Sequence, residues 1–235
     1  MKALLSIDGL LSLITLTFLE IVLGIDNIIF ISLVTQDLDP KIQPKARQLG
    51  IGLAMLFRVL MLLGITWLIG LTAPIFELGN HPVSGRDAIL FFGGVFLLAK
   101  ASTEIVKKTE GSGHVNERKS STLVGAIIQI GLLDIVFSFD SVLTAIGMTE
   151  NIAIMVIAVV ISMGIMLVFA KPIGDYIEKH VALQILALSF LIMIGTVLIA
   201  ESAHVEIPKP YVYSSVGFAL VVQLLSIRAA SKRKQ

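Results

Sequence analysis

The chain contains no cysteine among its 235 residues, and charged residues make up only 15% of it. The absence of cysteine excludes disulfide bonds and thiolate metal sites, so any bound metal must be held by oxygen or imidazole ligands. The few Lys and Arg residues are scattered over short segments, and the net charge is only +1. This distribution is typical of a membrane protein and argues against a nucleic-acid partner.

Apolar residues are abundant instead: they make up 56% of the chain, and the mean hydropathy is +0.93. A soluble domain of this length cannot bury so much apolar surface, whereas helices in a lipid bilayer turn it outward. Every proline, Pro172 included, is expected in or beside a gap between apolar runs. We therefore predict an all-α, polytopic membrane protein in which residues 1–235 form a single transmembrane domain. The predicted spans number seven: residues 10–34, 46–71, 87–106, 123–147, 152–170, 181–200 and 211–228.

The basic residues predict how the spans are oriented. Most of them fall in one alternating set of connecting segments, which includes residues 41–47, 107–119, 171–179 and 228–234. By the positive-inside rule this set is cytoplasmic, so the N-terminus lies outside and the C-terminus in the cytoplasm. The expected location is the inner (plasma) membrane of a bacterial cell.

Two segments repeat the same unusual pattern inside apolar runs. One reads Glu20-Ile-Val-Leu-Gly-Ile-Asp26-Asn27, and the other reads Asp134-Ile-Val-Phe-Ser-Phe-Asp140-Ser141. A charged side chain at the centre of a membrane helix costs about 2.5–3.5 kcal/mol on insertion scales. Carboxylates repeated at one spacing therefore indicate a functional site near the middle of the membrane.

The two motifs also predict an internal repeat. Three helices separate the start of the first motif's helix from that of the second, so the motifs cross the membrane in opposite directions. This is the pattern of an inverted repeat of three helices plus three. The repeats are expected at about residues 10–108 and 122–201, with a cytoplasmic loop at about 109–121 and a seventh helix at about 210–229.

Helix geometry limits how the acidic residues can meet. Residues seven apart nearly coincide on a regular helix, so Glu20 aligns with Asn27 and Asp134 with Ser141, whereas residues six apart are rotated by about 240°. An unwound turn between the two carboxylates of a motif would let them converge. Gly24 permits such a turn in the first motif. Ser138 takes that position in the second, where the flanking phenylalanines favour a regular helix.

Three segments together resemble the TerC family of integral membrane proteins: TLTFLEIVLGIDNIIF, LLDIVFSFDSVLTAIG and ALSFLIMIGTVLI. The similarity covers essentially the whole chain. It implies a manganese exporter with an architecture related to the LysE transporter superfamily. It also implies that the metal-binding positions are Glu20, Asp26, Asp134 and Asp140, all of which keep the family pattern.

The chemistry of these residues independently favours a hard divalent cation. Carboxylates, with Asn27, Ser141 and Gln129 as possible additional ligands, form an all-oxygen site that suits manganese, magnesium or calcium. The residues alone do not separate these ions. Arg58 is the only basic residue well inside a predicted span and is the expected counter-ion. Protons are a natural coupling ion, no prosthetic group is expected, and the oligomeric state stays open.

Two other classes of protein remain as alternatives to a transporter of manganese, calcium or another cation. An intramembrane aspartyl-type enzyme also needs buried acids, but the chain has no GxGD-like sequence and its acids form two symmetrical pairs. We therefore expect no enzymatic activity. A stress-related membrane protein without transport would leave the buried acids unexplained.

Overall fold

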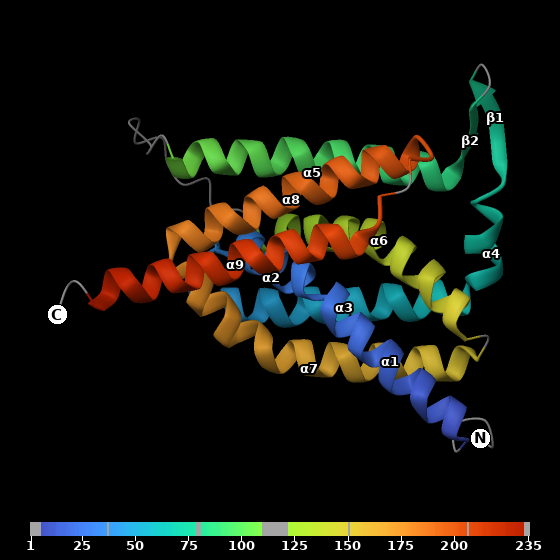
Figure 1. The fold of residues 1–235 in the computed structure, drawn as a ribbon, viewed down its shortest axis with the longest axis horizontal. Coiled ribbons are helices and arrows are strands. Elements are labelled where there is room, and N and C mark those ends of the chain that lie inside the picture. Colours follow the sequence, from blue (N-terminus) through green and yellow to red (C-terminus); the bar gives the residue numbers. More distant parts are fainter. Residues whose placement is uncertain are drawn as a thin grey trace. The chain divides into compact units, whose positions relative to one another are not determined.

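The computed structural model describes residues 6–36, 38–78, 81–109, 122–149, 151–205 and 207–232. The backbone is described at Asp26 and Asp140, but their side chains lie outside the description. The described chain is mostly helical (Figure 1). Its elements are α1 (Ile7–Leu23), α2 (Ile25–Thr35), α3 (Gln43–Leu63), α4 (Ile65–Gly70), β1 (Pro74–Leu78), β2 (His81–Ser84), α5 (Gly85–Thr109), α6 (Leu123–Met148), α7 (Ile152–Glu178), α8 (Val181–Ser202) and α9 (Lys209–Lys232).

Side-chain caps mark where two of the helices begin. The Ser6 hydroxyl accepts a hydrogen bond from the Gly9 amide at 3.1 Å before α1, and the Thr122 hydroxyl accepts one from the Gly125 amide at 3.2 Å before α6. Each cap satisfies one of the amides that a first helical turn leaves without an intrahelical partner. The apolar runs that follow remain helical because a helix satisfies its own backbone groups where no water is present.

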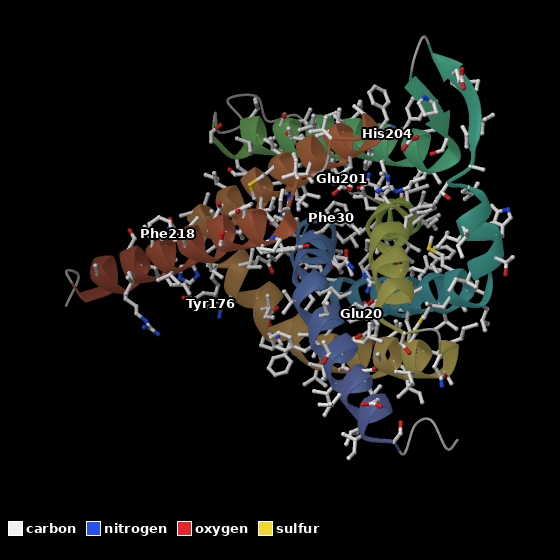
Figure 2. All side chains as sticks on the ribbon, turned by 45° about the vertical axis from the view of Figure 1, so that its right-hand side comes forward. Glu20, Phe30, Tyr176, Glu201, His204 and Phe218 are labelled. Carbon is white, nitrogen blue, oxygen red and sulfur yellow. The ribbon has the colours of Figure 1, made fainter. Side chains whose placement is uncertain are left out.

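Among the described residues, six helical segments are long and apolar enough to cross a membrane. Large apolar side chains cover their outer faces, as at Phe218 of α9, which is 73% exposed (Figure 2). The fourth predicted span corresponds to α6, a helix of 26 residues whose recognised apolar part is Leu123–Phe139. The six segments are Ile7–Thr35, Gln43–Leu63, Gly85–Thr109, Ile152–Glu178, Val181–Ser202 and Pro210–Ala229.

The chain divides into two compact units. The first contains α1 to α4, the β-hairpin, α6 and α7; within it α1 packs against α7, and α3 packs against both α6 and α7. The second contains α5, α8 and α9. There, a Cβ atom on Gly94 of α5 would lie 2.6 Å from the Gly195 carbonyl oxygen of α8, and one on Gly195 would lie 2.9 Å from the Gly94 carbonyl oxygen. Glycine therefore permits a close backbone contact between these two helices.

The first predicted span is interrupted at Gly24, where the sequence indicated that a break was possible. The Gly24 amide donates to the Ile21 carbonyl at 3.2 Å, so the interruption is a tightened turn and not an unwound segment. A Cβ atom at this position would lie 2.9 Å from the Glu20 carbonyl oxygen and 2.3 Å from the Met166 sulfur of α7. In contrast, α6 continues through Ser138 without interruption.

Three features of the backbone were not predicted. The connection after α4 forms an antiparallel hairpin of β1 and β2, so the all-α expectation omitted this element. The second predicted span ends early, because Gly64 separates α3 from α4. The interpretation of Pro172 as a gap residue was wrong, since α7 continues through it to Glu178. A proline near a helix end removes only one hydrogen bond, which the surrounding contacts can offset.

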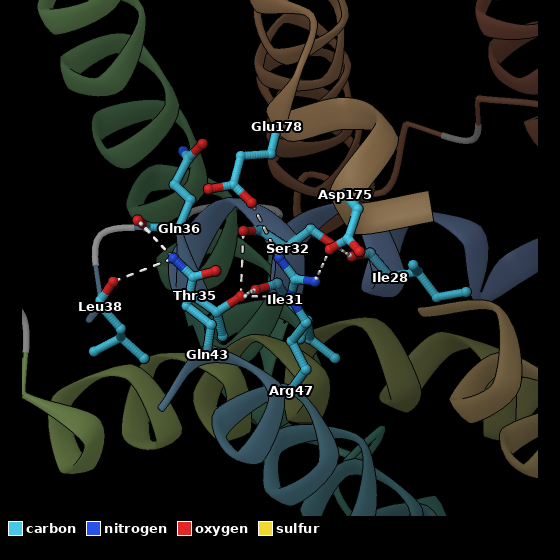
Figure 3. A network of polar contacts seen from close by, with 10 residues as sticks. All are labelled: Ile28, Ile31, Ser32, Thr35, Gln36, Leu38, Gln43, Arg47, Asp175 and Glu178. Carbon is cyan, nitrogen blue, oxygen red and sulfur yellow. Dashed lines mark hydrogen bonds and ion pairs between the residues drawn. The ribbon is translucent and has the colours of Figure 1, made fainter. Parts of the chain in front are cut away.

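The last turns of α7 are held by Arg47 near the start of α3 (Figure 3). The Arg47 guanidinium donates to an Asp175 carboxylate oxygen at 2.9 Å and lies 3.6 Å from a Glu178 carboxylate oxygen. Its Nε also donates to the Thr35 hydroxyl at the end of α2, at 3.3 Å. Arg47 is buried, and these contacts join the ends of three helices.

We expect Arg47→Gln to lower the free energy of unfolding by about 1–3 kcal/mol, because it removes charge-assisted hydrogen bonds. The loss stays moderate because the Asp175 and Glu178 side chains are nearly half exposed and remain hydrated without Arg47. Thermal unfolding in detergent measures the effect. Lys45→Gln removes an exposed charge from the same helix and is expected to leave the melting temperature unchanged. Equal melting temperatures for the two variants would contradict a stabilising role for Arg47.

Candidate ion-binding site

The first carboxylates of the two acidic motifs lie in the core of the first unit. Glu20 on α1 is 4% exposed and Asp134 on α6 is 3% exposed. Arg58 on α3 is buried beside them at 1% exposure. Figure 2 labels Glu20 on α1. Residues that are far apart in sequence thus bring two acids and one base together, away from water.

Arg58 bridges the two carboxylates. Its Nη1 donates a hydrogen bond to Glu20 Oε2, and its Nε lies 3.8 Å from Asp134 Oδ1. The same Nε donates to the Ser138 hydroxyl at 2.9 Å. Ser138 follows Asp134 by one helical turn on the uninterrupted α6, so both side chains reach the same guanidinium. The guanidinium is thereby fixed between α1 and α6.

Asp134 is not fully satisfied by these contacts. The Asn27 amide of α2 donates to Asp134 Oδ1 at 3.5 Å, which is a long hydrogen bond. Asp134 Oδ2 is buried and has no hydrogen-bond partner among the described residues. A buried carboxylate oxygen without a partner is costly, so this atom is where a further partner such as a cation would gain most.

The other predicted site residues are placed as follows. Ser141 is buried on α6, and its hydroxyl donates to the Ser138 carbonyl at 3.1 Å. Gln129 is half-buried on the same helix, and its separation of five residues from Asp134 rotates it by about 140° around a regular helix, away from the Asp134 face. The side chains of Asp26 and Asp140 lie outside the described part. Among the side chains that are described, no group of three or more acids or histidines is arranged to hold a metal.

A narrow apolar recess adjoins Glu20 on the side away from the Arg47 contacts. It has no room for a water molecule, so apolar packing separates Glu20 from solvent in this direction. Its lining residues are Leu16, Glu20, Leu62, Val142, Ala145, Met155, Ala158 and Val159.

Ser138 was not among the predicted site residues. The sequence pointed to this position only as the counterpart of Gly24, where an unwound turn would fall. The signal available was its spacing of four residues from Asp134, which places both on one face of α6. Its actual partner, Arg58, lies 80 residues away in the chain, and no local pattern links the two.

The apolar helices and the buried charged cluster define an integral membrane protein with a polar core. The chain belongs to the TerC family: the model of the "Integral membrane protein TerC family" matches residues 5–235.

Curated relatives support this assignment. A Haemophilus influenzae protein named "UPF0053 protein" is 48% identical over 223 residues, which is 94% of each chain. The "UPF0053 inner membrane protein YgdQ" of Escherichia coli K12 is 47% identical over 217 residues, which is 92% of each chain. The "UPF0053 protein YegH" of the same strain is 43% identical over 225 residues, covering 95% of this chain but only 43% of that longer protein. No solved structure matches the chain.

We expect Ser138→Ala to lower the free energy of unfolding by about 1–3 kcal/mol, because it leaves the buried Arg58 Nε without its hydroxyl acceptor. Ser162→Ala is the matched control. Ser138 and Ser162 are both 0% exposed, but among the described residues the Ser162 hydroxyl donates to the Val159 carbonyl of its own helix and to no other helix. Thermal unfolding should therefore show a larger loss for Ser138→Ala. A loss of equal size in both variants would mean that the contact with Arg58 contributes nothing.

Proposed function

We propose that this protein is a membrane transporter that exports manganese ions from the cytoplasm, with Glu20 and Asp134 among the metal ligands. One observation carries the proposal: the first carboxylates of two duplicated motifs converge on one guanidinium in the core. Transporters built from inverted repeats bind their substrates where the repeats meet, near the middle of the membrane. An acid from each motif at one buried point fits this design.

The proposed metal ligands also include Asp26 and Asp140, which follow from the family pattern. Asn27 lies beside Asp134 and can turn its amide oxygen to an ion, and Ser141 is buried on the same helix. A site of carboxylate, amide and hydroxyl oxygens suits a hard divalent cation, and the resemblance to manganese exporters selects manganese among them. We propose that protons are the coupling ion and that the protein uses no prosthetic group.

We propose that the helices form an inverted repeat of three plus three, with α6 as the fourth of seven spans and α9 as the last. The packing supports this pairing. In the repeat, α1 with α2 corresponds to α6, and α3 corresponds to α7. The contact of α1 with α7 is then the counterpart of the contact of α6 with α3, and both are present. The mutual contact of Gly94 and Gly195 between α5 and α8, the third helices of each repeat, has the same symmetry.

The geometry favours transport over the enzymatic alternative. Two carboxylates that act as an aspartyl-type catalytic pair lie next to each other and share a proton. Here Glu20 and Asp134 are each ion-paired with Arg58, an arrangement that a catalytic pair sharing one proton does not have. We therefore infer that the chain is not an enzyme of this type.

Intracellular manganese in cells grown under manganese load tests the proposal. Cells that express the wild-type chain should hold less manganese than cells without it, whereas Glu20→Gln and Asp134→Asn should lose at least 90% of this effect, because each removes a charged ligand. Asp8→Asn changes an exposed acid on the same helix as Glu20 and should behave as the wild type.

Other metals are measured in the same cells. If only the intracellular calcium or magnesium content changed, that ion would replace manganese as the proposed substrate, and the site assignment would stand. Wild-type export by both Glu20→Gln and Asp134→Asn would refute the site assignment, and an unchanged content of every metal would refute transport.

The orientation is testable because the chain has no cysteine. Thr72, after α4, and Thr109, at the end of α5, are both exposed threonines that the charge distribution places on opposite sides of the membrane. In intact spheroplasts, a membrane-impermeant maleimide should label Thr72→Cys and should label Thr109→Cys only after lysis. The reverse pattern would mean that the N-terminus is cytoplasmic.

A further inference from the structure

The described side chains of the site carry an uneven charge. Glu20 and Asp134 each contribute −1 and Arg58 contributes +1, so their formal sum is −2 + 1 = −1. All three are at least 95% buried. Ionised groups without partners are strongly disfavoured away from water, so Arg58 is what makes two adjacent carboxylates tolerable when no metal is bound.

We propose that Arg58 is a tethered exchange cation: its guanidinium occupies the carboxylates while the site holds no metal, and it withdraws from them when a divalent ion binds. This inference rests on the proposed function and adds the mechanism by which the empty site is stabilised. With Arg58 as their partner the two acids keep a formal charge of −1, whereas with a divalent ion as their partner the formal charge is zero. The ion therefore neutralises the two acids completely, which Arg58 does not.

The two cations compete for the same atoms. Arg58 Nη1 holds Glu20 Oε2, and Arg58 Nε lies 3.8 Å from Asp134 Oδ1. A small divalent ion binds carboxylate oxygens at about 2.0–2.6 Å. An ion shared by Glu20 and Asp134 would lie close to the guanidinium, and two positive groups at such a distance in a buried site repel each other strongly. Simultaneous occupation of both carboxylates is thus unfavourable.

The site also contains an acceptor for the displaced Arg58 guanidinium and an oxygen atom that the ion can contact first. The Ser138 hydroxyl, at 2.9 Å from Arg58 Nε, is a neutral acceptor that the guanidinium keeps after it leaves the acids. Asp134 Oδ2, which is buried and has no hydrogen-bond partner among the described residues, keeps its acceptor capacity for an incoming cation. Binding begins at Oδ2 and displaces Arg58 from Glu20 second.

The exchange has two consequences. The metal-free protein keeps its carboxylates paired with Arg58, so it can change conformation without carrying a metal ion. The metal must also displace Arg58, which weakens its binding and helps its release. Removal of Arg58 should therefore destabilise the metal-free protein and strengthen metal binding.

Thermal unfolding of the purified full-length protein in detergent, titrated with MnCl2, tests the inference. Arg58→Gln should melt at a lower temperature than the wild type without metal, show a larger upward shift with Mn²⁺, and bind Mn²⁺ with a dissociation constant at least tenfold lower. Arg47→Gln is the matched control. It removes another buried, ion-paired arginine of the same unit, but it should leave the Mn²⁺ dissociation constant unchanged.

The outcomes separate this inference from the proposed function. An equal or weaker Mn²⁺ affinity in Arg58→Gln, with the wild type stabilised by Mn²⁺, would overturn the exchange and keep the metal site. Stabilisation of neither protein by Mn²⁺, Mg²⁺ or Ca²⁺ would overturn the metal site itself and the exchange with it.

A second variant covers the case in which Arg58→Gln does not fold. Arg58→Lys keeps the positive charge but has a single ammonium group, which cannot reproduce the planar fork of N–H donors. It should bind Mn²⁺ more tightly than the wild type, because a weaker competitor holds the carboxylates. An affinity equal to or below that of the wild type would overturn the exchange.

Discussion

The ion pair of Arg58 with Glu20 and Asp134 is the constraint around which the first unit is arranged. A buried charge is tolerated only with close partners, so α1, α3 and α6 must meet at one point within hydrogen-bonding distance. The apolar surfaces of these helices do not impose such a meeting point, because lipid chains are as apolar as leucine. In a membrane, the polar contacts therefore specify the relative positions of helices that apolar packing would leave free to slide.

Details of the backbone follow from this constraint. The tightened turn at Gly24 lies between Glu20 and Asn27, and both side chains still reach the cluster on α3 and α6. A glycine at this point also lets Met166 of α7 pack directly against the turn. By contrast, α6 is regular because Asp134 and Ser138 need only the spacing of one helical turn to reach the same guanidinium. The two motifs are alike in sequence, but the first brings its side chains to the cluster through an interrupted helix and the second through a regular one.

The sequence was sufficient for features that depend on local composition. Apolar runs located the six described segments that are long enough to span a membrane, and Gly24 marked a position that permits an interruption. The hairpin of β1 and β2 was not predicted, although a Gly79-Asn80 dipeptide between two short runs that contain apolar residues is a hairpin signal in the sequence. The part of α7 beyond Pro172 is contacted by Arg47, which lies on another helix and donates to Asp175. In the site, the repeated acids were visible and Arg58 was the expected counter-ion, but which two carboxylates it contacts is a matter of tertiary structure that no spacing encodes.

The two ends of the first unit are closed by different chemistry, and this difference bears on how a buried ion could leave. On one side of Glu20, apolar side chains fill a recess that holds no water, so opening it exposes apolar surface to water. At the other end, Arg47 joins α3 to Asp175 and Glu178, whose carboxylates are already nearly half exposed. Water can replace those ionic contacts at a moderate cost in free energy, because the carboxylates are partly solvated before they separate. Opening is therefore easier at the Arg47 end, which the positive-inside rule predicts to be cytoplasmic.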